Sequence, residues 1–347
     1  MNCVEKWKHV AVMVTVEFSL ALIQILFKKA LNGGMDHLII VVYRQSISTI
    51  FLIPFVYFLE RKSWAKLTAK LIVQMFFCAL LGLTLTQYLF LVGLDYTSAT
   101  FTCAFINMVP VLTFVLALPL GMERLNMKSN NGKAKVLGTL TCVLGALILS
   151  LYKGILLINP SHFVQPSNHK SRPKRSFGLG SAFLSAGSLA WSSWFIAQSK
   201  IGHNYPYQYS STSIMSFFSA IQSAILCFAT HHRSTYSKWI LKGDVQILSV
   251  VYGGTVGSGL CYVAMSWCVK QRGPVFTAAF SPLIQIFTAV FDVMVLHEEI
   301  YLGSVSGSLV VILGMYVLLW GKSNDEETCD TVHKRTNGCN NSQDSST

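Results

Sequence analysis

The stretch FTCAFINMVPVLTFVLALPLGME, residues 101–123, returns in altered form as FTAAFSPLIQIFTAVFDVMVLHE, residues 276–298. At this offset of 175, the matching residues are Phe101, Thr102, Ala104, Phe105 and Glu123 with Phe276, Thr277, Ala279, Phe280 and Glu298. A second series follows at an offset of 169, and it pairs Gly138, Leu140, Leu144, Gly145 and Lys153 with Gly307, Leu309, Leu313, Gly314 and Lys322. The chain therefore contains an internal repeat.

Outside these stretches the chain is also strongly apolar. Of its 347 residues, 52% are hydrophobic and 12% are charged, and the mean hydropathy is +0.50. Soluble domains carry about 25% charged residues, so this chain lacks the polar surface to face water. A bilayer core takes roughly 20 apolar residues as a helix. Runs of about this length occupy residues 10–30, 37–59, 71–94, 98–120, 134–152, 177–199, 208–230, 245–269, 275–297 and 302–320. The sequence therefore predicts an all-α integral membrane protein with ten transmembrane helices.

Each copy of the repeat holds five of these spans, so the second copy must cross the membrane in the opposite direction. The basic residues support this inversion. The loop between spans four and five carries Arg124, Lys128, Lys133 and Lys135, whereas its counterpart between spans nine and ten carries no Lys or Arg. The loop between spans three and four carries none, whereas its counterpart carries Lys270 and Arg272. Because cytoplasmic loops collect Lys and Arg, we predict two inverted five-helix repeats with both termini in the cytoplasm.

The domain organisation follows from these boundaries. We expect a cytoplasmic N-terminus at residues 1–9, a first repeat at 10–152, a basic linker at 153–176 and a second repeat at 177–320. Residues 321–347 are polar and cannot bury enough apolar surface to fold alone, so a disordered tail is expected there.

The inverted repeat also indicates a class of function. Inverted-topology repeats are typical of secondary transporters, which bind a solute near the membrane midplane, where the repeats meet. We therefore predict a carrier of small solutes that works by alternating access. Its expected partners are the small-molecule solute and the lipid bilayer, and the sequence leaves open whether the chain forms a homo-oligomer. The alternative from another class is a membrane-embedded lipid or sugar transferase, and a seven-helix receptor is a weaker third.

Signals for other functions are absent from the sequence. The net charge of +12 lies in short clusters between apolar runs and not on a basic face, so no nucleic-acid partner is expected. The nine cysteines include no C-x-x-C pair, and His297-Glu298-Glu299 is followed by Tyr301 where a zinc-binding H-E-x-x-H motif needs His. No P-loop lysine signature is present. We expect no enzyme activity, no metal and no cofactor.

Several long motifs resemble a known family, from about residue 8 to residue 323. They are VYRQ (42–45), PFVYFLERK (54–62), GLDYTSATFTCAFINMVPVLTF (93–114), AKVLGTL (134–140), LYKG (151–154), RGPVFTAAFSPL (272–283) and EEIYLGSVSG (298–307). They are similar to plant drug/metabolite-superfamily carriers of the EamA type, the nodulin-21-like or Walls-Are-Thin-related (UMAMIT) transporters. The resemblance implies two EamA modules and transport of amino acids or related compounds such as auxin. It also implies the plasma membrane, with the vacuolar membrane as an alternative.

Ionisable residues inside membrane spans are costly and are therefore candidates for solute recognition. Glu17 lies about 10 Å into the first span, and we expect its carboxylate to attract a solute ammonium group or to take up a proton. Arg44, in the second span, could hold a carboxylate in a bidentate manner, although anchoring by snorkelling to the membrane surface is the favoured interpretation. Asp292 in the ninth span is more readily explained as solvated or paired with His297.

Amide side chains complete the set of candidates. Gln24, Gln87, Asn107, Gln198 and Gln285 lie within the predicted spans. Amides hydrogen-bond between helices as readily as they bind ligands, so both roles stay open for each of the five. Pro110 and Pro282 are expected to kink spans four and nine, and the Gly253-x-x-x-Gly257 motif to allow close helix packing.

Overall fold

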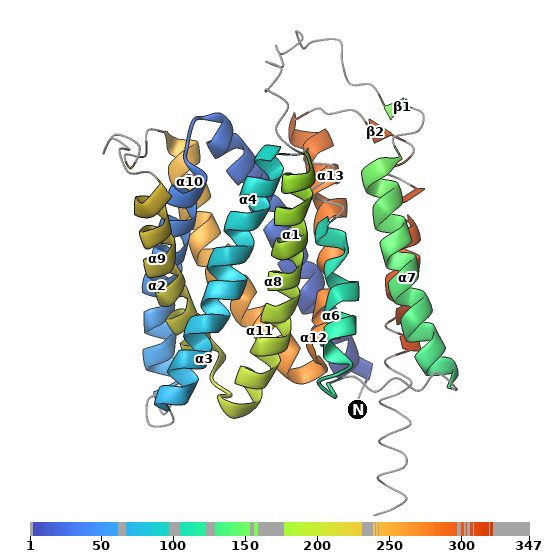
Figure 1. Cartoon of the computed structure of the whole chain (residues 1–347), viewed down its shortest axis with the longest axis horizontal. Coiled ribbons are helices and arrows are strands. Elements are labelled where there is room, and N and C mark those ends of the chain that lie inside the picture. The colour runs from blue at the N-terminus through green and yellow to red at the C-terminus, as the bar shows by residue number, and fades with distance from the viewer. Residues whose placement is uncertain are drawn as a thin grey trace, which may run out of the picture.

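The computed structural model is a bundle of helices (Figure 1). It describes residues 3–61, 67–96, 105–122, 129–152, 156–158, 177–230, 239, 241, 243–296, 300, 301, 303, 306, 307, 309–318, 320 and 321. The predicted linker lies largely outside these residues. The predicted tail beyond residue 321, His297 and the side chain of Asp292 lie wholly outside them.

The first repeat supplies five helical rods. They are α1 (Cys3–Asn32), α2 (His37–Leu59), a third rod made of α3 (Ala69–Ala79), η2 (Leu80–Leu85) and α4 (Thr86–Tyr96), a fourth ending in α6 (Val109–Ala117), and α7 (Asn130–Leu151). Side-chain caps are present at the start of two of these helices. Asp36 accepts a hydrogen bond from the Leu38 N–H at the start of α2, and Ser129 accepts one from Asn131 at the start of α7. Such caps satisfy N–H groups that lack a partner within the helix.

The second repeat has the same order of rods. They are α8 (Phe177–Asn204), α9 (Gln208–Thr230), an eighth rod made of α10 (Asp244–Tyr252), η4 (Gly253–Cys261) and α11 (Tyr262–Arg272), and a ninth made of α12 (Pro274–Ala278) and α13 (Ser281–Leu296). The tenth includes the apolar helix Leu309–Leu318. Between α11 and α12 the chain turns at Gly273, whose φ of 87° is a conformation that side chains disfavour.

Five of the described helices are long and apolar enough to cross a membrane, and three shorter apolar helices accompany them. Together with α7 and α8, these helices account for the ten predicted spans. As expected for a span that contains Pro282, the ninth rod is not a continuous helix: it breaks at Ala279 and Phe280, just before the proline. The fourth has a turn at Met108 just before Pro110. Proline cannot donate the backbone hydrogen bond that a continuous helix needs.

The structure contains two short strands that the sequence analysis did not predict. β1 (Leu156–Ile158) lies in the predicted linker and pairs antiparallel with β2 (Ile300–Tyr301), which lies in the connection between the ninth and tenth rods. Figure 1 shows this pair outside the bundle, beyond the end of α7.

The contact between the fifth and tenth rods confirms that the repeats are inverted. A Cβ atom at Gly138 would lie 2.8 Å from the Gly314 carbonyl oxygen, and one at Gly145 would lie 3.0 Å from that of Gly307. Residue numbers therefore rise along α7 while they fall along its equivalent helix, so the two run antiparallel. The last described helical residue, Gly321, packs against Asn131 at the start of α7. Figure 1 shows α7 beginning on the side where α1 begins, so both ends of the described bundle lie on one face.

Candidate functional site

A cavity of about 230 Å³ lies between the two repeats. Residues of α1, α2, the third rod and the fourth rod line it from the first repeat, and residues of α8, α11 and α13 line it from the second. Its apolar wall consists of Leu20, Ile23, Phe27, Leu31, Ile40, Val41, Phe90, Ile106, Trp191, Met265 and Ile284. Its polar groups belong to Gln24, His37, Arg44, Thr86, Gln87 and Tyr262. A mostly apolar cavity with a few polar groups is typical of a small-molecule site.

The cavity opens toward the turn between α1 and α2. Leu31 and His37 flank this turn and line the cavity. Gln24, one to two turns deeper on α1, is exposed although it lies inside the bundle, because its side chain faces the open space. The cavity is therefore accessible from the face opposite to the start of α1.

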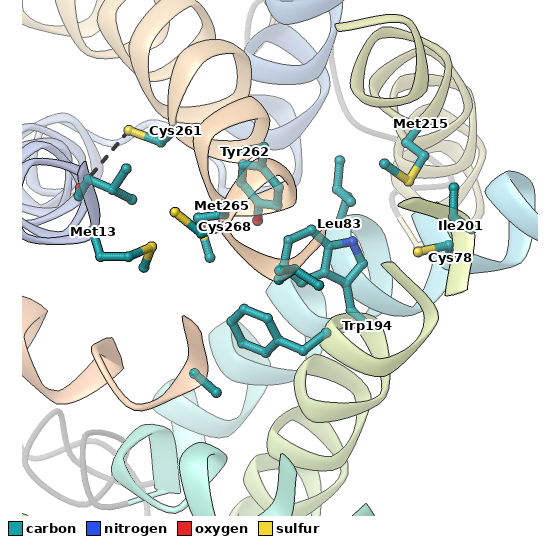
Figure 2. Packing of buried hydrophobic residues seen from close by; sticks show 14 of the residues in the cluster. Met13, Cys78, Leu83, Trp194, Ile201, Met215, Cys261, Tyr262, Met265 and Cys268 are labelled. Carbon is teal, nitrogen blue, oxygen red and sulfur yellow. Dashed lines mark hydrogen bonds between the residues drawn. The ribbon is translucent and has the colours of Figure 1, made fainter. Parts of the chain in front are cut away.

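Toward the other face, the bundle is closed by a cluster of buried apolar side chains, which we call the closing cluster: Met13, Leu71, Met75, Cys78, Leu83, Trp194, Ile201, Met215, Cys268 and Phe276. They come from the first half of α1, from α3 and η2, from α8 and the start of α9, and from α11 and α12. Tyr262 and Met265 pack against this cluster and also line the cavity, so they form its floor. Figure 2 shows Leu83, Trp194 and Cys268 of this cluster together with Tyr262 and Met265.

Trp194 is the largest side chain of the closing cluster and is fully buried. Its ring lies edge-on to Tyr262 at 5.3 Å between centroids (Figure 2). It also covers Gly82 of η2, where an added Cβ atom would lie 2.0 Å from Trp194 Cδ1. The indole therefore occupies space that only a glycine at position 82 leaves free.

Arg44 projects from α2 across the bundle to the second repeat. Its Nε donates a hydrogen bond of 2.5 Å to Ser258 Oγ in η4, and its guanidinium carbon lies 5.6 Å from the Phe27 ring centroid. Gly257 lies beside it, since a Cβ atom there would be in van der Waals contact with Nη2 at 3.5 Å. The favoured prediction that Arg44 snorkels to the surface does not match this position, because the side chain is bonded inside the bundle at the cavity wall.

Gln24 and Gln87, which the sequence suggested, also line the cavity. Gln87 lies next to the side chain of Tyr262, and both line the cavity. Its carbonyl oxygen Oε1 is buried and has no hydrogen-bond partner among the described residues. A buried acceptor without a partner is costly, so Oε1 is available to a donor group on a bound solute.

Glu17 does not line the cavity in this conformation. Its side chain is 3% exposed, and it lies one turn before Leu20, on the face of α1 that carries Gln24. The described residues provide no hydrogen bond to its carboxylate. Its predicted contact with a solute ammonium group stays a prediction.

The other three amides are bonded between helices. Asn107 donates from Nδ2 to Gln285 Oε1, and Gln198 donates from Nε2 to Ser266 Oγ at 2.8 Å. None of the three lines the cavity, so the structure places them in the interhelical role that the sequence left open beside binding.

Some cavity residues were missed by the sequence reasoning. Phe27, His37 and Thr86 line the cavity. They are neither acidic, arginine nor amide residues within a predicted span, which were the residue types chosen as candidates. A helical projection of α1 through Leu20, Gln24, Phe27 and Leu31 would have grouped Phe27 with Gln24. Among the described residues, no group of three or more His, Cys, Asp or Glu side chains could hold a metal ion.

Comparisons with known proteins agree with this architecture. The family model of the EamA-like transporter family matches residues 7–151 and 178–320. Three WAT1-related proteins of Arabidopsis thaliana are 49%, 46% and 43% identical over 94%, 92% and 96% of this chain and 90%, 88% and 91% of their own. One crystal structure of a protein, 13% identical, superposes with a TM-score of 0.66 over 90% of this chain and 97% of that one, and it supports the fold alone.

Proposed function

The chain belongs to the EamA-like transporter family, and from this premise we propose that it carries amino acids or related small metabolites, auxin among them, by alternating access. The family and its relatives establish that the chain is a multi-pass membrane transporter of small solutes. The same relatives indicate a transporter rather than a membrane-embedded transferase. The plasma membrane remains the proposed location.

The observation that carries the proposal is the asymmetry around the central cavity. The cavity is open on one face and closed by the closing cluster on the other. Two inverted repeats offer two packings of similar energy, each open to one side. Exchange of the two packings would carry a bound solute across without opening a continuous path.

Equivalent contacts support such an exchange. Gly82 and Gly257 are separated by the repeat offset of 175, and each lies against the first helix of the other repeat. Gly82 packs under Trp194 of α8, and Gly257 packs against Ile23 of α1. In the present state the Trp194 contact lies in the closed half, while Ile23 lines the open cavity.

Uptake of radiolabelled solutes into oocytes that express the chain tests the cargo. We expect saturable uptake of apolar or aromatic amino acids, or of indole-3-acetate, above that of water-injected oocytes. Efflux of labelled solute from preloaded oocytes should be accelerated by unlabelled solute outside, because a carrier with solute bound returns to the inward-open state faster than an empty one. If no amino acid or auxin moves in either direction, the cargo proposal fails, and the family and fold remain.

A further inference from the structure

We propose that Arg44 binds the anionic group of the cargo and makes the cavity select organic anions over neutral or cationic solutes of the same shape. This inference rests on the proposed transport function and names the chemical feature that the cavity recognises.

The first support is the charge of the cavity. Arg44 brings a permanent positive charge into a space whose described lining contains neither Asp nor Glu. Its side-chain hydrogen-bond partner among the described residues, Ser258 Oγ, is neutral and bonds only Nε. A guanidinium has five N–H groups, and its Nη groups match a carboxylate in a bidentate manner. A charge held in apolar surroundings is stabilised by a counter-charge, and the cargo is the natural source of one here.

The second support is that the guanidinium is held in place. Ser258 fixes Nε from the second repeat, the Phe27 ring lies beside the guanidinium from α1, and Gly257 packs next to Nη2. A side chain that served only as a surface anchor would extend to the membrane surface. Arg44 instead connects the two repeats at the cavity wall. A bound anion would therefore contact a side chain of the first repeat that is hydrogen-bonded to the second.

The third support is the rest of the cavity. Phe27, Phe90 and Trp191 offer aromatic surface for the body of a solute. The free Gln87 Oε1 offers an acceptor for one N–H group. The described lining offers no carboxylate to an ammonium group, so a positive charge on the cargo contributes little to binding. The cavity therefore fits a small solute with one anionic group on an apolar or aromatic body.

Four probes of nearly the same shape separate the recognised groups. Phenylacetate carries only the carboxylate, phenethylamine only the ammonium, phenylalanine both and phenylacetamide neither. Binding to purified protein in detergent is measured by the shift in melting temperature, and transport by competition with labelled phenylalanine in proteoliposomes. We expect phenylacetate and phenylalanine to bind, and phenylacetamide and phenethylamine to bind at least about tenfold more weakly.

Variants then assign this preference to Arg44. Arg44→Gln should remove the difference between phenylacetate and phenylacetamide, whereas Arg44→Lys, which keeps the charge but not the bidentate geometry, should retain part of it. Arg61→Gln is the matched control, because Arg61 is an exposed arginine at the end of the same helix. If Arg44→Gln does not fold, Arg44→Lys and Ser258→Ala are used instead. Both substitutions should weaken the binding of phenylacetate more than the binding of phenylacetamide.

The outcomes are distinguishable. If phenethylamine binds as well as phenylacetate, or if Arg44→Gln discriminates the probes as the wild type does, the role of Arg44 is refuted while transport stands. If the anion preference appears in binding but no probe or amino acid is transported, the proposed function fails while the anion site stands.

Discussion

Arg44 and Glu17 are both ionisable residues of the first repeat within membrane spans, yet their surroundings differ. Arg44 lines the open cavity and bonds Ser258 of the other repeat. Glu17 is buried and does not line the cavity, and Met13 of the closing cluster lies one turn before it. One charge is therefore placed to meet a solute in this state, and the other can meet it only after the helices rearrange.

We predict that Glu17→Gln reduces the dependence of uptake on external pH while leaving anion binding to the open cavity intact. The reason is that Glu17 can gain or lose a proton during the transport cycle, whereas glutamine cannot, and the two side chains have nearly the same shape. Uptake of labelled phenylalanine across acidic to neutral pH, at matched expression, measures the effect. A pH profile identical to that of the wild type would remove Glu17 from any proton step.

At the scale of elements, the π-helical segments η2 and η4 occupy equivalent places in the third and eighth rods. Each contains a glycine at the repeat offset, Gly82 or Gly257, and each is crossed by the first helix of the other repeat. π-helical turns frequently occur at functional sites. Here each brings a glycine backbone close to a side chain of the other repeat, Trp194 in the closed half and Ile23 in the open half.

Gly82→Ala should open the closed half. The new methyl group would overlap the Trp194 ring at 2.0 Å, and since a rigid indole in a packed core cannot yield easily, the ring has to leave its place. Cys268 is fully buried in the closing cluster and can report this change. We expect a small maleimide to modify Cys268 faster in Gly82→Ala than in the wild type.

The control for this experiment is Gly243→Ala, because a Cβ atom at Gly243 meets no atom within 4 Å. It should leave the labelling rate unchanged. Labelling of Gly82→Ala at the wild-type rate, in protein that is folded by its melting curve, would show that the tryptophan does not hold the half closed.

At the scale of the whole molecule, the antiparallel contact of the fifth and tenth rods shows that the two repeats cross the membrane in opposite directions. We predict that epitope tags at both termini are inaccessible to antibody in intact cells and become accessible after permeabilisation, because the loops on that face carry more Lys and Arg. A tag between Lys170 and Arg175, in the linker on the other face, is the positive control. Detection of one terminal tag but not the other in intact cells would contradict the inverted architecture.

Much of this architecture could be predicted from the sequence. The apolar runs are long enough to cross a bilayer, and lipid leaves a chain few alternatives to the helix because every backbone polar group must be bonded internally. The odd number of spans in each repeat, with the exchange of basic residues between equivalent loops, predicted the inversion. The polarity of residues within spans also included Arg44, Gln24 and Gln87 among the candidates.

Only the tertiary structure decided which candidates meet in the cavity. Arg44, Gln24, Gln87, Asn107, Gln198 and Gln285 all looked alike as polar residues in apolar spans, but three line the cavity and three lie outside it, bonded between helices. The direction in which a side chain points depends on the rotation of each helix and on its neighbours, and the π-helical turns shift that rotation within a span. Composition determines that a segment enters the membrane, whereas packing between the two repeats determines which of its faces encloses the solute.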